Sequence, residues 1–287
     1  MYQPFELSRL IEGKEAFVTT ADGTRLYTIT AGQGDTTVLL AHGYNVNNIE
    51  WNIIVPQLTE GGYRIIVFDQ RGHGQSSIGT EGISSASMAS DYKTIIEHFG
   101  LNQCILVGHS MGGFLSIKTL LTYPELQHTA IKACVLMATF AGDVNKHNFQ
   151  NRIQIPMIRL GITRWLIKNK ILGTFFAKTL IGANPDPELI RALIDIFLKQ
   201  DVKPLIPILK AFIDESYYDQ LHKITIPCIV VVGDKDKVTP MFHSTDMARL
   251  LSNASLMTIP QKGHCLNAEA PESIVAAVIQ LDLVGQV

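Results

Sequence analysis

Short runs of apolar residues recur along the chain, and longer segments with apolar residues at helical spacing separate them. The runs are rich in β-branched residues and occupy Thr37–Ala41, Tyr63–Asp69, Cys104–Gly108, Ala133–Ala138 and Pro227–Gly233, with a shorter run at Ser255–Ile259. A strand that is apolar at nearly every position is buried on both faces, which is typical of a parallel sheet covered by helices. The pattern therefore predicts an α/β fold on a mostly parallel sheet.

Helical patterns fill the gaps between these runs. They cover Trp51–Leu58, Ser87–Phe99, Met111–Thr122, Met241–Leu251 and Pro271–Leu283. Two earlier segments, Ala16–Thr19 and Arg25–Thr30, alternate apolar and polar residues and end at glycine-containing turns. They predict an antiparallel hairpin at the N-terminal edge of the sheet. A further amphipathic segment at Gln3–Ile11 is expected to form a short lead helix.

The alternation is interrupted once, between Ala138 and Pro227. About ninety residues lie there, far more than an ordinary connection between strands needs. They carry apolar residues at helical spacing, interrupted by several prolines. We expect a helical cap at residues 141–222, inserted into an α/β core made of residues 1–140 and 223–287.

The overall charge changes the picture only when it is divided by region. The chain has 287 residues, with 24 Lys plus Arg against 26 Asp plus Glu, and its mean hydropathy is +0.17. Without a basic excess, a general nucleic-acid binder is excluded. Yet Val144–Pro185 holds seven basic residues and no acidic one, which leaves the rest of the chain with a net charge of −9. Either these side chains simply face water, or the basic apolar cap makes transient contact with an anionic lipid surface.

The N-terminus and the cysteines bear on where the protein acts. The first residues lack the basic and apolar regions of a secretory signal, and no long uncharged stretch is apolar enough to span a bilayer. The four cysteines form no CxxC pair, which argues against a disulfide framework and against a zinc site. A cytoplasmic setting is expected.

The strongest chemical signal is the sequence GHSMGG at residues 108–113. It directly follows the strand-like run CILV and directly precedes a helical segment. A serine on such a sharp strand-to-helix turn, here Ser110, has strained backbone angles, and the neighbouring glycines let other segments approach closely. The turn exposes the hydroxyl at a helix N-terminus, where a developing negative charge is favoured. The pattern predicts a nucleophilic serine.

These residues resemble the α/β-hydrolase superfamily, and the resemblance covers nearly the whole chain. The run TVLLA leads into His42-Gly43-Tyr44, which is similar to the family's oxyanion loop, and residues 69–76, DQRGHGQS, look like its structural turn. By this resemblance the backbone N–H groups of Tyr44 and Met111 form the oxyanion hole.

A serine needs a base to remove its proton and a carboxylate to orient that base. In this fold the chain order is serine, acid, histidine. The resemblance assigns the acid to the last position of a G-x-x-D motif, Asp236, with Asp234 and, less favoured, Asp143 as rivals. The base is then His264, because the other histidine downstream of the acid, His243, falls within a helical pattern.

The predicted reaction is acyl transfer to water. No metal-ligand spacing and no phosphate-binding loop is visible, so neither a metal nor a cofactor is expected. Serine at the nucleophile position argues against dehalogenase and epoxide hydrolase chemistry. The chain resembles the esterase and monoacylglycerol-lipase-like branch, which implies small apolar esters as substrates.

Three other functions stay open at this stage. One is a carbon–carbon bond hydrolase of a vinylogous diketone that holds its substrate carboxylate with Arg152, Arg159 or Arg164. The others are a hydrolase-fold ligand receptor and a cofactor-free perhydrolase that uses the same residues. The sequence gives no indication of oligomeric state.

Overall fold

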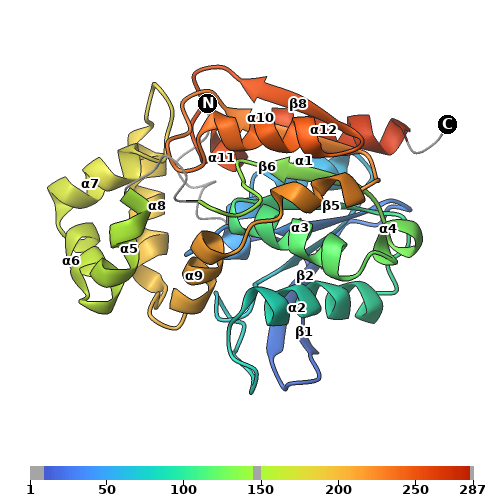
Figure 1. Ribbon diagram of the computed structural model, residues 1–287, viewed down its shortest axis with the longest axis horizontal. Helices are drawn as coiled ribbons and strands as arrows, with labels where there is room; N and C mark the ends of the chain where they lie inside the picture. Colours follow the sequence, from blue (N-terminus) through green and yellow to red (C-terminus); the bar gives the residue numbers. More distant parts are fainter. Residues whose placement is uncertain (1–9, 145–149, 285–287) are drawn as a thin grey trace.

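The computed structural model describes residues 10–144 and 150–284. Within these ranges the chain forms a mixed sheet with helices on both faces (Figure 1). The lead helix predicted at Gln3–Ile11 lies almost wholly outside the described residues. For Gln150–Ile153 only the backbone is described.

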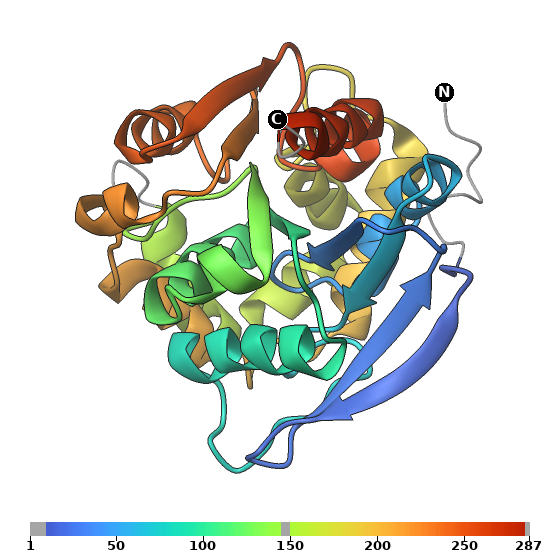
Figure 2. The same cartoon turned by 90° about the vertical axis from the view of Figure 1, so that its right-hand side faces the viewer.

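An eight-stranded sheet runs through the molecule in the order β1-β2-β4-β3-β5-β6-β7-β8 (Figure 2). Its strands are β1 (Lys14–Thr19), β2 (Arg25–Ala31), β3 (Thr37–Ala41), β4 (Arg64–Phe68), β5 (Cys104–His109), β6 (Ile131–Met137), β7 (Cys228–Gly233) and β8 (Ala254–Ile259). β1 pairs antiparallel with β2, and β2 pairs antiparallel with β4. All other pairs are parallel. The predicted parallel sheet with an antiparallel N-terminal edge is confirmed.

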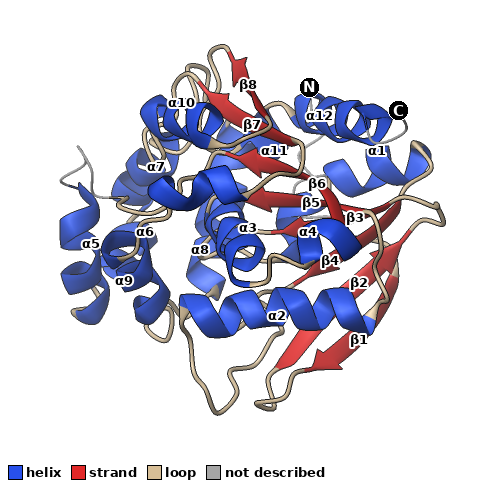
Figure 3. Cartoon of the chain, turned by 45° about the vertical axis from the view of Figure 1, so that its right-hand side comes forward, coloured by secondary structure: helices blue, strands red, loops and turns tan. Residues whose placement is uncertain are grey.

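Helices cover both faces of this sheet, as Figure 3 shows. They are α1 (Ile54–Glu60), α2 (Ser85–His98), α3 (Met111–Thr122), α4 (Leu126–Thr129), α10 (Met241–Leu250), α11 (Leu266–Glu269) and α12 (Pro271–Val284). Side chains of α2, α3 and α10 share one apolar core with the sheet, and those of α1 and α12 share the other. The strands therefore lie between two apolar layers, as their continuous apolar sequences require.

One helix begins differently from its predicted range, Trp51–Leu58. The structure has a 3-10 helix at Asn48–Trp51, followed by α1 at Ile54–Glu60. The side chain of Asn47 accepts a hydrogen bond from the amide of Ile49 and so starts the 3-10 turn earlier than the apolar spacing indicated. This turn places Glu50 in the interior, which matters for the site.

The segment between β6 and β7 contains α5 (Gln150–Arg159), α6 (Ile162–Lys168), α7 (Lys170–Lys178), α8 (Pro187–Lys199), α9 (Ile206–Asp214) and a 3-10 helix at Tyr218–Lys223. Helices α5 to α8 gather on one side of the molecule (Figure 1). By contrast, α9 packs Ile208 and Phe212 into the core that the sheet shares with α2 and α3. The cap bounds of 141–222 stay a prediction.

Two short contacts join this helical group to the loop that carries His264. The His264 amide donates a hydrogen bond to the carbonyl of Leu180 (2.8 Å), and Leu180 packs in one apolar cluster with Leu189 and Cys265. The helical group and the loop are therefore fixed relative to each other. Among the described residues, no helix combines the length and apolar character needed to cross a bilayer.

Candidate active site

Ser110 occupies the turn between β5 and α3. Its backbone has φ 52° and ψ −113°, a conformation that costs energy for a residue with a side chain. The strain predicted for this turn is therefore present. A Cβ on Gly112 would lie 2.2 Å from the carbonyl oxygen of Ala41, and one on Gly108 would lie 2.6 Å from the backbone of Gly112. Only glycine fits at these two positions.

His264 and Asp236 meet beside this turn. Nδ1 of His264 lies 2.9 Å from Oδ2 of Asp236, and both side chains are buried. Because a carboxylate only accepts, Nδ1 carries the proton and Nε2 is left to accept one. His264 thus has the tautomer that a general base for a serine hydroxyl requires.

The carboxylate of Asp236 is held by three further donors. Oδ1 accepts from the amides of Val238 (2.8 Å) and Thr239 (2.9 Å), and Oδ2 accepts from the Thr239 hydroxyl (2.7 Å). Burial alone raises the pKa of Asp236, but its interaction with His264 and these hydrogen bonds outweigh it. The pKa of Asp236 therefore lies below its ordinary value, and the group stays ionised.

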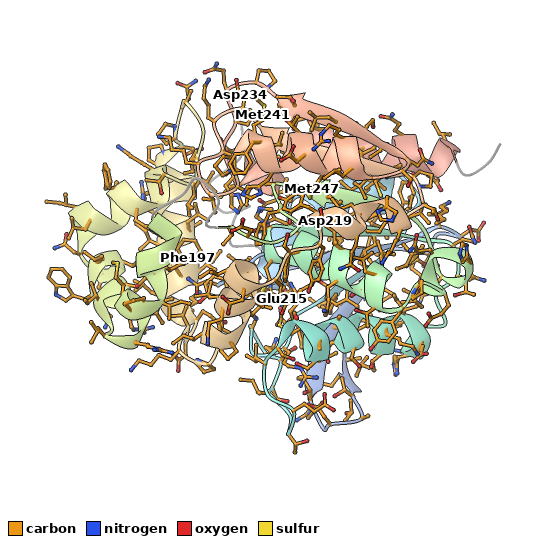
Figure 4. The ribbon with its side chains drawn as sticks, viewed as in Figure 1. Phe197, Glu215, Asp219, Asp234, Met241 and Met247 are labelled. Atoms are coloured by element: carbon orange, nitrogen blue, oxygen red, sulfur yellow. The ribbon has the colours of Figure 1, made fainter. Side chains whose placement is uncertain are left out.

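The two rival carboxylates lie elsewhere. Asp234 Oδ1 accepts from the amide of Gln261 (2.7 Å), and its Oδ2 pairs with Lys235 (3.4 Å). Figure 4 shows Asp234 at the outer edge of the fold. Asp143 is exposed, and its amide donates to the carbonyl of Glu215 (3.0 Å). Of the three candidates, Asp236 is the one in contact with His264.

Met111 and Tyr44, whose amides are predicted to form the oxyanion hole, line or adjoin the site around Ser110. Met111 is the first residue of α3, and the first N–H groups of a helix have no partner within it. In the oxyanion loop, a Cβ on Gly43 would lie 3.5 Å from Cβ of Ser110, so Tyr44 follows directly on the segment that packs on the serine. Among the described residues, the buried Tyr44 hydroxyl has no hydrogen-bond partner, and its ring lines the same cavity as Ser110.

A buried ion pair lies beneath this loop, and no sequence motif had pointed to it. The Glu50 carboxylate contacts Nδ1 of His109 and also accepts the Gly43 amide at Oε2 (2.8 Å). Nε2 of His109 lies 3.0 Å from the carbonyl oxygen of His264. Both neighbours of the His109 ring are acceptors, an environment that favours the imidazolium form. Glu50 and His109 thereby connect the oxyanion loop, the serine turn and the His264 loop.

The pKa directions agree with this assignment. Burial lowers the pKa of His109, but the Glu50 carboxylate more than offsets it, so the pKa lies above its ordinary value. Burial raises the pKa of Glu50, and His109 with the Gly43 amide brings it below its ordinary value. In contrast, Nε2 of His42 accepts the Gln70 amide (2.9 Å), so that ring is neutral, and burial lowers its pKa.

The structural turn at residues 69–76 is held by buried charges. Arg71 pairs with Asp91 (2.7 Å) and with Asp22 (2.5 Å), and all three side chains are buried. Asp69 accepts the amides of Asn48 and Gln75, both at 2.8 Å. The hydrogen bond from the Asn48 amide to Asp69 joins this turn to the start of the 3-10 helix that carries Glu50.

A cavity of about 1250 Å³ opens above Ser110, between the sheet edge and the helices α5 to α8. Ser110, His264 and Asp236 line its floor. Its walls are mostly apolar side chains of the helices α5 to α8, among them Ile158, Leu166, Leu172, Phe175 and Phe197, the last of which is labelled in Figure 4. Among the described residues, no cluster of histidine, cysteine and acidic side chains could hold a metal ion.

Comparisons with known proteins agree with this architecture. The family model described as serine aminopeptidase, S33, matches residues 32–271. The chain is 28% identical over 266 residues to an uncharacterized hydrolase of Bacillus subtilis, covering 89% of this chain and 93% of that protein. It is 25% identical over 258 residues to a non-heme haloperoxidase of Rhodococcus erythropolis, covering 86% and 92%. An esterase from Exiguobacterium antarcticum shares the fold, with a TM-score of 0.83 at 23% identity over 93% of this chain and 98% of that one.

Proposed function

Because the chain belongs to the serine aminopeptidase S33 family of α/β-hydrolases, we propose that it hydrolyses carboxylic esters of apolar acyl groups through an acyl-enzyme on Ser110. The observation that carries this proposal is the Asp236–His264 hydrogen bond beside Ser110, on the floor of a large apolar cavity.

In the first half-reaction, Ser110 Oγ attacks the ester carbonyl while Nε2 of His264 accepts the hydroxyl proton. Asp236 stabilises the imidazolium that forms, and the amides of Tyr44 and Met111 stabilise the tetrahedral oxyanion. His264 then returns the proton to the leaving alcohol. In the second half, water attacks the acyl-enzyme, with His264 again acting first as base and then as acid.

The lining of the cavity favours an ester over a peptide with a free amino terminus. An aminopeptidase needs a carboxylate that is free to hold the substrate's ammonium group. The carboxylates among the described lining residues, Glu50 and Asp236, are each paired with a histidine. The walls instead offer apolar surface that suits an acyl chain.

The carbon–carbon bond hydrolase is disfavoured for a related reason. That reaction calls for a cation that holds the substrate carboxylate. Arg159 and Arg164 are exposed and do not line the cavity, and the Arg152 side chain lies outside the described part of the chain. No other arginine is found among the described lining residues, and the one lysine there, Lys237, has an exposed side chain.

A chain-length series of p-nitrophenyl esters tests the proposal, together with fluorophosphonate labelling. We expect labelling that Ser110→Ala abolishes, and a kcat/KM that rises from acetyl to longer acyl esters as apolar surface is buried. Labelling without turnover of any ester would reject ester hydrolysis in favour of the other serine-dependent reactions. No labelling at all would favour the ligand receptor.

A second candidate, perhydrolysis, is supported by the similarity to the Rhodococcus haloperoxidase. Here hydrogen peroxide replaces water as the attacking group, so that the acyl-enzyme yields a peracid and regenerates Ser110. The peracid formed from acetate would then oxidise bromide. We expect Ser110→Ala to remove bromination of monochlorodimedone in acetate buffer with peroxide, and bromination that survives this change would exclude the route.

A further inference from the structure

Large apolar side chains are exposed on and beside the helices α5 to α7. Leu160, Trp165, Ile171 and Phe175 have 74%, 63%, 80% and 71% of their surface exposed. They come from the end of α5 and from α6 and α7, which contact one another in series. Figure 1 shows α6 and α7 at the outermost edge of the molecule. We call these four residues the outer cap surface.

From α5 to α7, and in the turns between these helices, every charged residue is basic. Five of them are exposed on or beside the same helices: Arg159, Arg164, Lys168, Lys170 and Lys178. Within the described part of the chain, none of the five makes a salt bridge with a carboxylate. The rest of the chain is net acidic, at −9 outside Val144–Pro185. An anionic plane would therefore attract the cap and repel the body, which orients the molecule.

The outer cap surface also continues into the cavity above Ser110. Leu172, Phe175 and Phe176 are exposed and at the same time line the cavity. A hydrocarbon chain that leaves a bilayer beneath α7 would stay in contact with apolar side chains on its way to Ser110. A patch that served only to join two proteins would have no reason to open into this cavity.

We propose that the outer cap surface docks on a membrane rich in anionic phospholipid. The four apolar side chains enter the interface between headgroups and acyl chains, while the lysines and arginines contact lipid phosphates. The two contributions complement each other, because neither a few apolar side chains nor a few charges hold a protein on a bilayer alone. A second copy of this chain is a poorer occupant, since a two-fold contact would bring like-charged caps together. The inference does not depend on which bond Ser110 attacks.

Vesicle sedimentation and tryptophan fluorescence test this docking. The chain has two tryptophans: Trp51 is fully buried, and Trp165 belongs to the outer cap surface. We expect the emission to shift to the blue with vesicles of phosphatidylcholine and phosphatidylglycerol, and to stay unchanged with phosphatidylcholine alone. Because each lysine near an anionic surface contributes roughly fivefold to binding, Lys168→Gln with Lys170→Gln should lower partitioning by about 25-fold.

Matched variants separate docking from folding. Lys14→Gln with Lys223→Gln removes two exposed lysines outside α5 to α8 and should leave partitioning unchanged. Trp165→Ser with Ile171→Ser should abolish sedimentation, whereas Ile279→Ser with Leu283→Ser, on α12, should not. Neither Trp165 nor Ile171 lines the cavity, so hydrolysis of a short water-soluble ester should persist in that variant.

Three results would overturn the proposal. One is equal binding to neutral and anionic vesicles, and another is loss of sedimentation in both lysine pairs alike. The third is a concentration-dependent dimer in analytical ultracentrifugation that Trp165→Ser with Ile171→Ser dissolves, because the surface would then be an interface between copies of the chain.

Discussion

Replacing Asp236 with asparagine keeps the size of the side chain but replaces the hydrogen-bond acceptor that faces His264 with a donor. Oδ1 of Asp236 accepts two backbone amides, so the asparagine oxygen has to take that position. The amide nitrogen then replaces Oδ2, which lies 2.9 Å from Nδ1 of His264. Because this nitrogen donates, Nδ1 must accept, and the imidazole proton moves to Nε2. His264 can then no longer accept the proton of Ser110.

The expected loss of activity follows from this change of tautomer. Forcing the wrong tautomer on a catalytic histidine lowers kcat by about 10⁴-fold, which corresponds to about 5 kcal/mol in the barrier. The assay is the steady-state hydrolysis of p-nitrophenyl butyrate at pH 8. We expect the loss in kcat and only a small change in KM, because the buried Asp236 carboxylate acts on the reaction through its hydrogen bond to His264.

Asp234→Asn is the matched control, two residues earlier in the same loop. Its oxygen can still accept the Gln261 amide, and its partly exposed pair with Lys235 contributes little. We expect kcat within about twofold of the unaltered protein, which corresponds to about 0.4 kcal/mol. If Asp234→Asn abolished turnover while Asp236→Asn did not, the assignment of the acid would be refuted. A cooperative thermal unfolding transition in both variants is the control that each one is folded.

Three further changes test the surrounding structure. Glu50→Gln should lower the free energy of unfolding, measured in urea, by about 3–5 kcal/mol, since it leaves a buried imidazolium unpaired. Because the pKa of His109 is raised, this loss of stability should be largest near pH 6 and shrink as the pH rises through the pKa of His109 in the folded protein. Gly112→Ala should lower the melting temperature, and equal melting temperatures would contradict the 2.2 Å approach of its Cβ to the Ala41 carbonyl. Arg71→Met should lower the free energy of unfolding by about 3–5 kcal/mol in the same assay, because two buried carboxylates lose their cation. A loss below 1 kcal/mol would show that the fold does not depend on Arg71 to pair these carboxylates.

The sheet could be predicted from sequence because each buried strand is a continuous apolar run, and such runs recur along the chain. β3 and α3 begin and end at the predicted residues, Thr37–Ala41 and Met111–Thr122. The first is a continuous apolar run, and the second starts at a turn whose glycines and serine permit little else. Where a polar side chain starts an element, as Asn47 does, the apolar pattern alone misplaces the boundary.

The support beneath the site could not be predicted in the same way. Glu50 and His109 are far apart in the chain, and nothing in their local patterns marks them as partners. The one available signal was a carboxylate between the apolar residues Ile49 and Trp51, which hints at burial but names no counter-ion. The position of His109 next to Ser110 does not indicate that its side chain joins the carbonyl of His264 to Glu50.

The helices and the basic charge of the segment between β6 and β7 could be predicted, but not which of its side chains are exposed. Apolar spacing between Ala138 and Pro227 predicts helices, and Val144–Pro185 holds basic residues without acidic ones. Which side chains turn inward depends on how α5 to α8 pack together, and short helices joined by tight turns leave that open. The structure places Phe176 partly in the cavity and Trp165 on the outside, a division that spacing does not reveal.

The most direct test of the central claim is to trap the acyl-enzyme. Protein mixed with p-nitrophenyl octanoate is quenched in acid during the first turnover, digested and analysed by mass spectrometry. We expect an octanoyl group on the peptide that contains Ser110, formed at the rate of the p-nitrophenol burst and absent in Ser110→Ala. Steady release of p-nitrophenol with no acylated Ser110, at a rate that Ser110→Ala leaves unchanged, would contradict the account.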